Sequence, residues 1–217
     1  MTTILSSVAR QAAIDDWEAA VHHRFVAELG AGSIEDAVMR RYLVQDYQFC
    51  DAFVAVLGQA CASAPTLSSR LRYARQLGFF AADENNYFND AFDELGVTEA
   101  DRQQPELHWA TRAFDALMRE VTASRSYPQV VALLLVAEWL YADWAATIAD
   151  RPTRPLHRDW VTIHDTPDFR AWVGWLRSEL DSTVLPTEPN RAEVIDVFKR
   201  ASSCERAFFD AAYDSAG

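Results

Sequence analysis

The segment LLLVAEWLYADWA, residues 133–145, is the most apolar run of the chain, and it predicts a buried helix. The helical pattern around it extends from about Pro128 to Ala149 and ends before Pro152, which suits a helix bounded by prolines. One acid, Glu138, stands in the middle of this run. An ionised carboxylate costs several kcal/mol to bury unless it is paired, hydrogen-bonded or neutralised. The segment that predicts the core of the fold therefore also contains an acid whose burial needs an explanation.

Helical patterns also dominate the rest of the chain, and no run alternates as a strand does. A possible serine cap at Ser33 and the proline at position 65 bound one long helix. The predicted helices cover residues 33–64, 67–95 with a break near Gly78, 107–124, 128–149, 167–184 and 191–213. We find no repeat and no long flexible linker. Residues 1–217 are therefore predicted to form one all-α domain, a helical bundle.

Composition excludes several classes of function. The chain has 217 residues, half of them hydrophobic, and a formal net charge of −12 with scattered basic residues. Neither a nucleic acid nor an anionic membrane surface is an expected partner. We expect a cytoplasmic protein, because no signal peptide is evident and no stretch reaches the roughly 18 apolar residues of a membrane span. The three cysteines, without a CxxC pair, predict neither disulfides nor a zinc site.

Three acids lie on apolar helix stripes. Asp46 falls between Tyr42 and Phe49, at steps of four and three residues. Glu138 and Glu205 have the same relation to the apolar stripes of their own helices. These stripes are Leu134, Tyr141, Ala145 and Ile148 for the first, and Val194, Phe198, Ala201, Phe208 and Ala212 for the second. All three carboxylates are therefore predicted to face the core.

Two interpretations of these acids remain open. Each could be paired with an arginine from another helix, such as Arg41 or Arg112. Alternatively, the acids converge on one pocket together with nearby aromatic residues, which are Tyr47, Phe49, Phe114, Trp139 and Tyr141. Aromatic rings can enclose a flat heterocycle while carboxylates bind its amino group and ring nitrogens. Burial would also raise at least one pKa, giving an acid able to hold or pass a proton near neutral pH.

The order of motifs resembles the TenA/thiaminase II family, whose members are helical bundles that act on the thiamin pyrimidine. The matching blocks are HHRFVAELGAGS and YLVQDYQF early in the chain, then FDELGVTE, EWLYADW and CERAFFDAAY. The resemblance implies the TenA and haem-oxygenase-like fold and a homo-tetramer or homo-dimer. It places Asp46 at the position of the aspartate that binds the pyrimidine and Glu205 at the position of a glutamate that transfers protons. Tyr141 matches a tyrosine of the fifth-helix motif.

The chain departs from the thiaminase II pattern at the nucleophile. Ala137 stands where those enzymes have a cysteine, and Val136 replaces the preceding proline. Neither Cys50 nor Cys204 occupies the matching position. A covalent route through a thiolate is therefore not expected at this position. In this match, Phe114 and Leu176 stand where the family has tyrosines.

The pattern is similar to the branch of the family that lacks this cysteine. That resemblance implies removal of formyl or amino groups from (N-formyl) 4-amino-5-aminomethyl-2-methylpyrimidine, giving the hydroxymethylpyrimidine. We expect Glu138 and Glu205 to be catalytic, and the substrate-binding residues to be Asp46, Tyr47, Phe49, Phe114, Trp139 and Tyr141. No cofactor and no metal are predicted. A non-catalytic binder of aminopyrimidines is the first alternative.

Metal-dependent oxidation on a similar bundle is the second alternative, and it requires a histidine next to an acid on a core face. The five histidines are His22, His23, His108, His157 and His164. They do not have that spacing, and we expect each to be a surface or capping residue. A purely structural protein would leave the three stripe acids unexplained.

Overall fold

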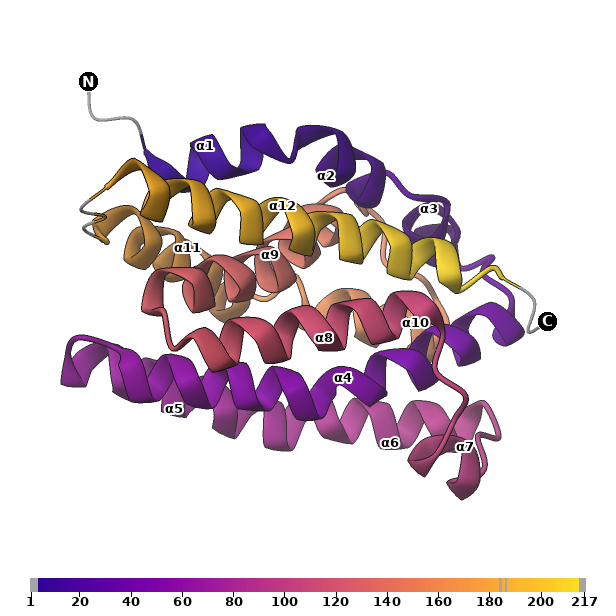
Figure 1. Cartoon of the computed structure of the whole chain (residues 1–217). Coiled ribbons are helices and arrows are strands. Elements are labelled where there is room, and N and C mark those ends of the chain that lie inside the picture. Colours follow the sequence, from indigo (N-terminus) through magenta and orange to yellow (C-terminus); the bar gives the residue numbers. More distant parts are fainter. Residues whose placement is uncertain (1–3, 184, 186, 215–217) are drawn as a thin grey trace.

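The computed structural model describes residues 4–183, 185 and 187–214. This part of the chain is all-α and contains no strand, as predicted. Its elements are α1 (Leu5–Ala12), α2 (Ile14–Val21), α3 (Arg24–Ala31), α4 (Asp36–Ser63), α5 (Leu67–Phe79), the π-helix η1 (Phe80–Glu84), α6 (Asn85–Glu94), α7 (Glu99–Gln103), α8 (Trp109–Ser124), α9 (Tyr127–Ala146), α10 (Pro155–Ile163), α11 (Pro167–Ser182) and α12 (Glu188–Ala211). Figure 1 shows the long helices α4, α8 and α12 running side by side along the molecule.

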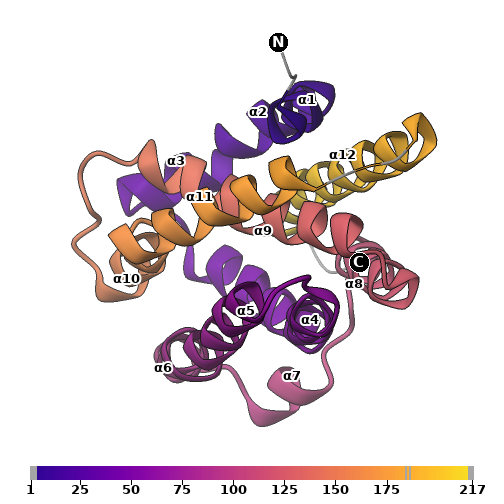
Figure 2. The same ribbon diagram turned by 90° about the vertical axis from the view of Figure 1, so that its left-hand side faces the viewer.

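Helix α9 lies at the centre of the bundle (Figure 2). It contacts α12 and α11 on one side and α4, α8 and α2 on the others. Its residues from Val130 to Val136 are all buried, because the helix is apolar all round rather than on one stripe. We expected no segment apolar enough to span a membrane, but α9 is long and apolar enough to do so. In the structure, 78% of its most apolar window is buried inside the bundle.

The predicted helices are present, with one informative difference. The pattern over residues 67–95 is continuous through Gly78 and contains the π-helix η1 in place of a break. A π-helix accommodates an extra residue within a helix and is often found at functional sites. Gly96 then ends α6 with a positive φ of 63°, and the side chain of Thr98 caps α7.

Five helices lie outside the predicted ranges. Three of them, α1 to α3, pack the N-terminal segment against α12, α9, α10 and α11. The short α7 lies between the predicted helices 67–95 and 107–124, and α10 lies between 128–149 and 167–184. Helix α10 is also short, and Pro155 occupies its first turn, a position that proline tolerates because no backbone N–H is needed there.

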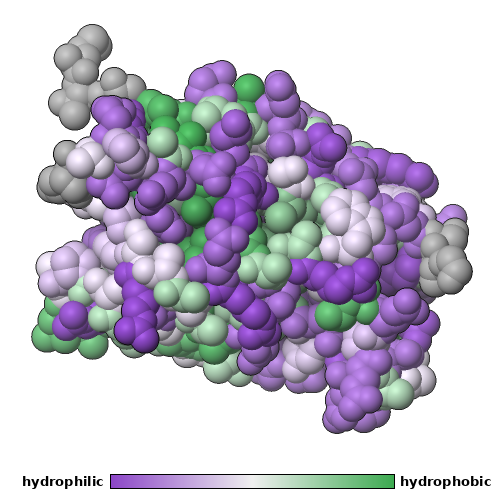
Figure 3. Space-filling model, in the orientation of Figure 1, coloured by the Kyte–Doolittle hydropathy of each residue, from purple (hydrophilic) through white to green (hydrophobic). Residues whose placement is uncertain are grey.

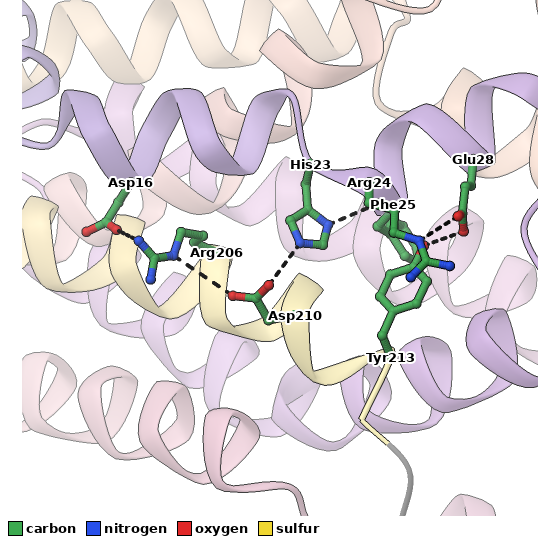
Figure 4. A network of polar contacts seen from close by, with 8 residues as sticks. All are labelled: Asp16, His23, Arg24, Phe25, Glu28, Arg206, Asp210 and Tyr213. Carbon is green, nitrogen blue, oxygen red and sulfur yellow. Dashed lines mark hydrogen bonds and ion pairs between the residues drawn. The ribbon is translucent and has the colours of Figure 1, made fainter.

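A polar network fixes the C-terminal half of α12 to the N-terminal helices (Figure 4). The Nδ1 atom of His23 accepts a hydrogen bond from the backbone N–H of Phe25, so its Nε2–H donates to Asp210, 3.1 Å away. Arg206 pairs with Asp16 of α2 at 2.8 Å. The Tyr213 hydroxyl donates to Glu28 of α3 at 2.6 Å. These contacts hold the part of α12 that begins at Glu205 against α2 and α3.

The surface reflects the acidic composition. Hydrophilic residues cover most of the face drawn in Figure 3, and apolar patches are small. The most exposed large apolar side chains are Leu67, Leu71 and Trp109, which lie at the start of α5 and of α8. The apolar residues of the long helices are otherwise directed into the core, where the candidate site lies.

Candidate active site

A small cavity lies between α4, η1, α9 and α12, at the middle of the bundle. The centre of a water molecule can occupy about 50 Å³ of it, several times the roughly 10–15 Å³ needed to hold one water. The lining residues are acidic, aromatic or small: Asp46, Phe49, Cys50, Phe53, Phe80, Glu84, Phe88, Phe114, Met118, Ala137, Glu138, Tyr141, Trp160, His164 and Glu205. No lysine or arginine is among these lining residues.

The structure brings the three predicted acids together in this cavity. Asp46, Glu138 and Glu205 come from three different helices, and their exposed fractions are 6%, 6% and 1%. None forms an ion pair with a described residue. In particular, Arg41 donates to the carbonyl oxygen of Ala212 and Arg112 to that of Leu107. The alternative in which these arginines neutralise the acids is therefore wrong.

A fourth carboxyl group, that of Glu84, lines the same cavity and was not predicted. Glu84 is the last residue of η1. The extra residue of a π-helix shifts the register of side chains around the helix axis, so a regular helical period cannot predict which way Glu84 points. The only signal in the sequence was the interrupted pattern after Gly78. No hydrogen bond joins the Glu84 carboxyl to another described side chain.

Burial makes all four acids weaker than usual. It raises the pKa of Asp46 to about 8, while the Tyr42 hydroxyl opposes this rise by favouring the carboxylate. Burial raises the pKa of Glu138 to about 7, with the indole N–H of Trp172 acting in the opposite direction. The pKa of Glu205 is well above its usual range because of burial and the nearby charge of Asp46. The site therefore holds carboxyl groups that are neutral or half-ionised near pH 7.

Three of the predicted aromatic residues line the cavity. Phe49 and Phe114 have ring centroids 5.3 Å apart, and Phe49 also contacts Phe208 in an edge-on arrangement at 5.1 Å. The hydroxyl groups of Tyr141 and Tyr42 are hydrogen-bonded at 2.7 Å. These rings surround the carboxyl groups with flat apolar surfaces.

The other two predicted aromatic residues lie elsewhere, which corrects the expectation that all five share one pocket. Tyr47 follows Asp46 by one residue, about 100° around the helix, and packs against Phe88 and Phe92. Trp139 has the same relation to Glu138 and contacts Trp17 at 5.1 Å. Neither residue lines the cavity.

Two histidines are buried rather than on the surface. His157 is buried and caps no helix, and His164 is buried although it is the C-cap residue of α10; His23 and His108 cap helices as expected. His164 lines the cavity just after α10, and its Nδ1 lies 2.8 Å from the carbonyl oxygen of Trp160. Because a carbonyl only accepts, Nδ1 carries the proton and Nε2 is the acceptor. Burial lowers the pKa of His164 to about 4, so the ring is neutral at pH 7.

Ala137, which the family resemblance aligns with the thiaminase II cysteine, lines the cavity beside Glu138. Both adjacent residues of α9 reach the cavity. Cys50 lines it too, but burial and the charge of Asp46 raise the pKa of its thiol well above the usual range, which disfavours a reactive thiolate. Leu176 is fully buried in the core and is not a lining residue. No group of three or more metal-ligating side chains was found within the described residues.

The chain matches the TENA/THI-4/PQQC family model over residues 10–215, and it belongs to that family. An aminopyrimidine aminohydrolase of Helicobacter pylori is 25% identical over 203 residues, which are 92% of this chain and 94% of the relative. The crystal structure of a TenA homologue from Pyrococcus furiosus superimposes with a TM-score of 0.85 at 20% identity, covering 96% of this chain and all of that one.

The fold extends to a more distant class of proteins. Haem oxygenase-1 from the cyanobacterium Synechocystis, in complex with haem, matches with a TM-score of 0.57 at 15% identity. The match covers 96% of this chain and 91% of the haem oxygenase. The all-α, TenA and haem-oxygenase-like architecture predicted from the sequence is therefore confirmed.

Proposed function

We propose that this protein is a thiamin pyrimidine salvage hydrolase of the branch that lacks the active-site cysteine. Its substrates would be 4-amino-5-aminomethyl-2-methylpyrimidine, its N-formyl derivative, or both, and the final product the hydroxymethylpyrimidine. The observation that carries the proposal is one cavity that combines aromatic rings with buried, unpaired acids, while Ala137 leaves space where a thiol would stand. The relative from Helicobacter pylori, named aminopyrimidine aminohydrolase, supports the same class of reaction.

Asp46 is suited to bind the aminopyrimidine edge. In this ring an amino group, which donates, lies next to a ring nitrogen, which accepts. A neutral carboxyl group presents the complementary pair, because its O–H donates and its carbonyl oxygen accepts. Asp46 is neutral at pH 7, since burial raises its pKa to about 8. The rings of Phe49 and Phe114 would then lie against the flat heterocycle.

Glu138 and Glu205 are proposed to carry out hydrolysis of the amine. Glu138, with a pKa of about 7, is ionised in half or more of the molecules above neutral pH and can accept a proton from water. Glu205, whose pKa is raised well above its usual range by burial and by the charge of Asp46, is the proton donor to the departing nitrogen. Water adds to the methylene carbon as the C–N bond breaks, and ammonia and the alcohol are formed. Both acids regain their starting state by proton exchange with solvent.

Loss of the nucleophile also favours a second candidate, a protein that binds aminopyrimidines without turnover. This candidate is supported by Ala137 and by the binding geometry of Asp46, which needs no catalysis. It differs from the first in one outcome only, the absence of product.

The deciding experiment compares the N-formyl aminomethylpyrimidine, its free amine and thiamin as substrates of the purified protein. Formate, ammonia and the pyrimidine products are measured separately. We expect turnover of one or both of the first two, and its loss in Glu205→Gln, which keeps the shape of the side chain. The matched control is Asp90→Asn, the same change at an exposed acid of α6 that forms no ion pair with a described residue. Binding of the pyrimidine without any product in the wild type would favour the binder.

A further inference from the structure

The Glu84 carboxyl is a reactive group for which the proposed function has no role so far. Glu84 lines the cavity from η1, and Glu138 lines it from α9. Neither carboxyl group forms an ion pair with a described residue, and the indole N–H of Trp172 is a polar neighbour of Glu138. The Oε2 atom of Glu205 is fully buried and has no hydrogen-bond partner among the described residues. No carboxyl oxygen of Glu84 or Glu138 is both fully buried and without a partner. Both carboxyl groups are thus open to the cavity.

The two carboxyl groups line the same small cavity, so the charge of one acts on the other. Burial raises the pKa of Glu84 well above its usual range, and the charge of Glu138 is the next largest cause, ahead of that of Asp46. Two nearby carboxylates without a cation cannot both be ionised at low cost, so such a pair retains one proton. We assign the shared proton to Glu84, whose pKa is raised by burial and by the charge of Glu138, and the role of base to Glu138, which has a pKa of about 7.

We propose that Glu84 is a catalytic residue, and that Glu84 and Glu138 act together as an acid and a base to hydrolyse an amide on the pyrimidine, the N-formyl group. This inference rests on the proposed function and names the substrate class for one part of its site. A neutral and an ionised carboxyl group that share one proton are the arrangement used by aspartic proteases for amide hydrolysis.

The reaction balances without a metal or any co-reactant other than water. In the first step Glu138 takes a proton from water, whose oxygen bonds to the formyl carbon, and Glu84 donates its proton to the formyl oxygen. In the second step Glu138 returns the proton to the amide nitrogen, the C–N bond breaks, and a hydroxyl of the intermediate gives its proton to Glu84. Formic acid and the free amine leave, and the pair again holds one proton on Glu84.

The position of Glu138 and Glu84 in the cavity explains how the reaction can proceed without a cysteine nucleophile. Ala137 precedes Glu138 on α9 and also lines the cavity, so a small side chain leaves room beside the base. The cavity exceeds the minimum volume for one water even without a ligand. Water held there lies next to Glu138, and the neutral His164, through Nε2, offers a further acceptor. The attacking group is then a water molecule rather than a side chain.

The test measures formate release from the N-formyl pyrimidine and ammonia release from the free amine in the same variants. General acid catalysis contributes roughly 10²- to 10⁴-fold. We therefore expect Glu84→Gln to lower kcat for formate release at least about 100-fold, with KM changed less than about threefold. Ammonia release, which uses Glu138 and Glu205, should fall less than about fivefold, while Glu138→Gln should abolish both. Asp90→Asn is the control.

A second measurement is independent of turnover. Carboxyl carbons of glutamate are labelled with ¹³C, and the titration of Glu84 is followed by NMR in the wild type and in Glu138→Gln. The pair predicts that Glu138→Gln lowers the pKa of Glu84, because a like charge has been removed. The groups that also face Glu84, Asp46 and Cys50 of α4, are unchanged in this comparison.

The outcomes separate this inference from the proposed function. If Glu84→Gln keeps more than a tenth of the formate release, or if Glu84 titrates identically with and without Glu138, the inference is wrong. Equal losses of both activities together with a lower Tm would also reject it, since Glu84 would then be structural. If the wild type releases neither formate nor ammonia, the proposed function fails, and the NMR titration still decides whether the pair exists.

Discussion

Replacing the buried base should make this protein more stable. In Glu138→Gln an ionisable group is exchanged for a neutral one of the same shape. Burial raises the pKa of Glu138 from 4.5 to about 7, a difference of about 2.5 pH units, and each unit corresponds to about 1.4 kcal/mol. At pH 8, where the folded wild type must keep this carboxylate ionised, the substitution should raise the free energy of unfolding by about 3 kcal/mol.

The sign follows from proton binding. The folded protein binds the Glu138 proton more tightly than the unfolded chain does, so the associated stability is fully present below about pH 4 and is lost as the pH rises through about 7. The advantage of Glu138→Gln should therefore shrink to about 1 kcal/mol at pH 5. For a chain of this size, 3 kcal/mol corresponds to roughly 6–12 °C in Tm.

The assay is urea unfolding followed by circular dichroism at pH 5 and pH 8, at one protein concentration so that any assembly contributes equally. Asp90→Asn, on the surface of α6, should change the unfolding free energy by less than about 0.5 kcal/mol at either pH. The reasoning is refuted if Glu138→Gln is no more stable than the wild type at pH 8. An equal gain at both pH values would refute it too, because that gain could not arise from ionisation of Glu138.

The other predictions concern the cavity. For the free amine, kcat/KM measured from pH 5 to pH 9 should rise as Glu138 ionises near pH 7 and fall above about pH 8 as Asp46 loses its proton. In calorimetry, Asp46→Leu should weaken pyrimidine binding about 30- to 100-fold by removing two buried hydrogen bonds, whereas Asp46→Asn, which still offers a donor and an acceptor, should bind within about tenfold. Trp139→Phe should leave KM unchanged, because Trp139 packs on Trp17 outside the cavity. Ala137→Cys should introduce a thiol whose alkylation is slowed by bound pyrimidine, whereas alkylation at an equal rate with and without ligand would place residue 137 outside the binding site.

The sequence predicts the parts of this site that obey a regular helical period. Asp46, Glu138 and Glu205 could be placed on the core face because α4, α9 and α12 are regular and long, so the steps of three and four residues carry through to the structure. Tyr47 and Trp139 each follow a stripe acid by one residue and point about 100° away from it, but this offset alone does not exclude a residue, since the adjacent Ala137 and Glu138 both line the cavity. The order of the motifs suggested the family, and the family implied the fold.

The residues that the sequence did not predict lie where the period fails. Glu84 is placed by a π-helix, whose extra residue turns the side chain towards the cavity. His164 follows α10, a short helix in a segment rich in proline and arginine, and its position depends on packing against Trp160 and Phe169. Such positions are set by tertiary contacts and not by any local pattern.

No described lysine or arginine lines the cavity, and this affects both the stability of the fold and the pKa values of the four acids. An arginine beside the four acids would stabilise the fold by keeping them ionised, but it would also lower their pKa values and remove the neutral carboxyl groups that donate protons. Without it, Asp46 is neutral near pH 7, the pKa of Glu84 stays well above its usual range, and Glu138, with a pKa of about 7, can exist in either protonation state. Burying these acids without a cation costs stability, and the same burial raises their pKa values. Hydrolysis by water needs a neutral acid and an ionised base, and the raised pKa values supply both near pH 7.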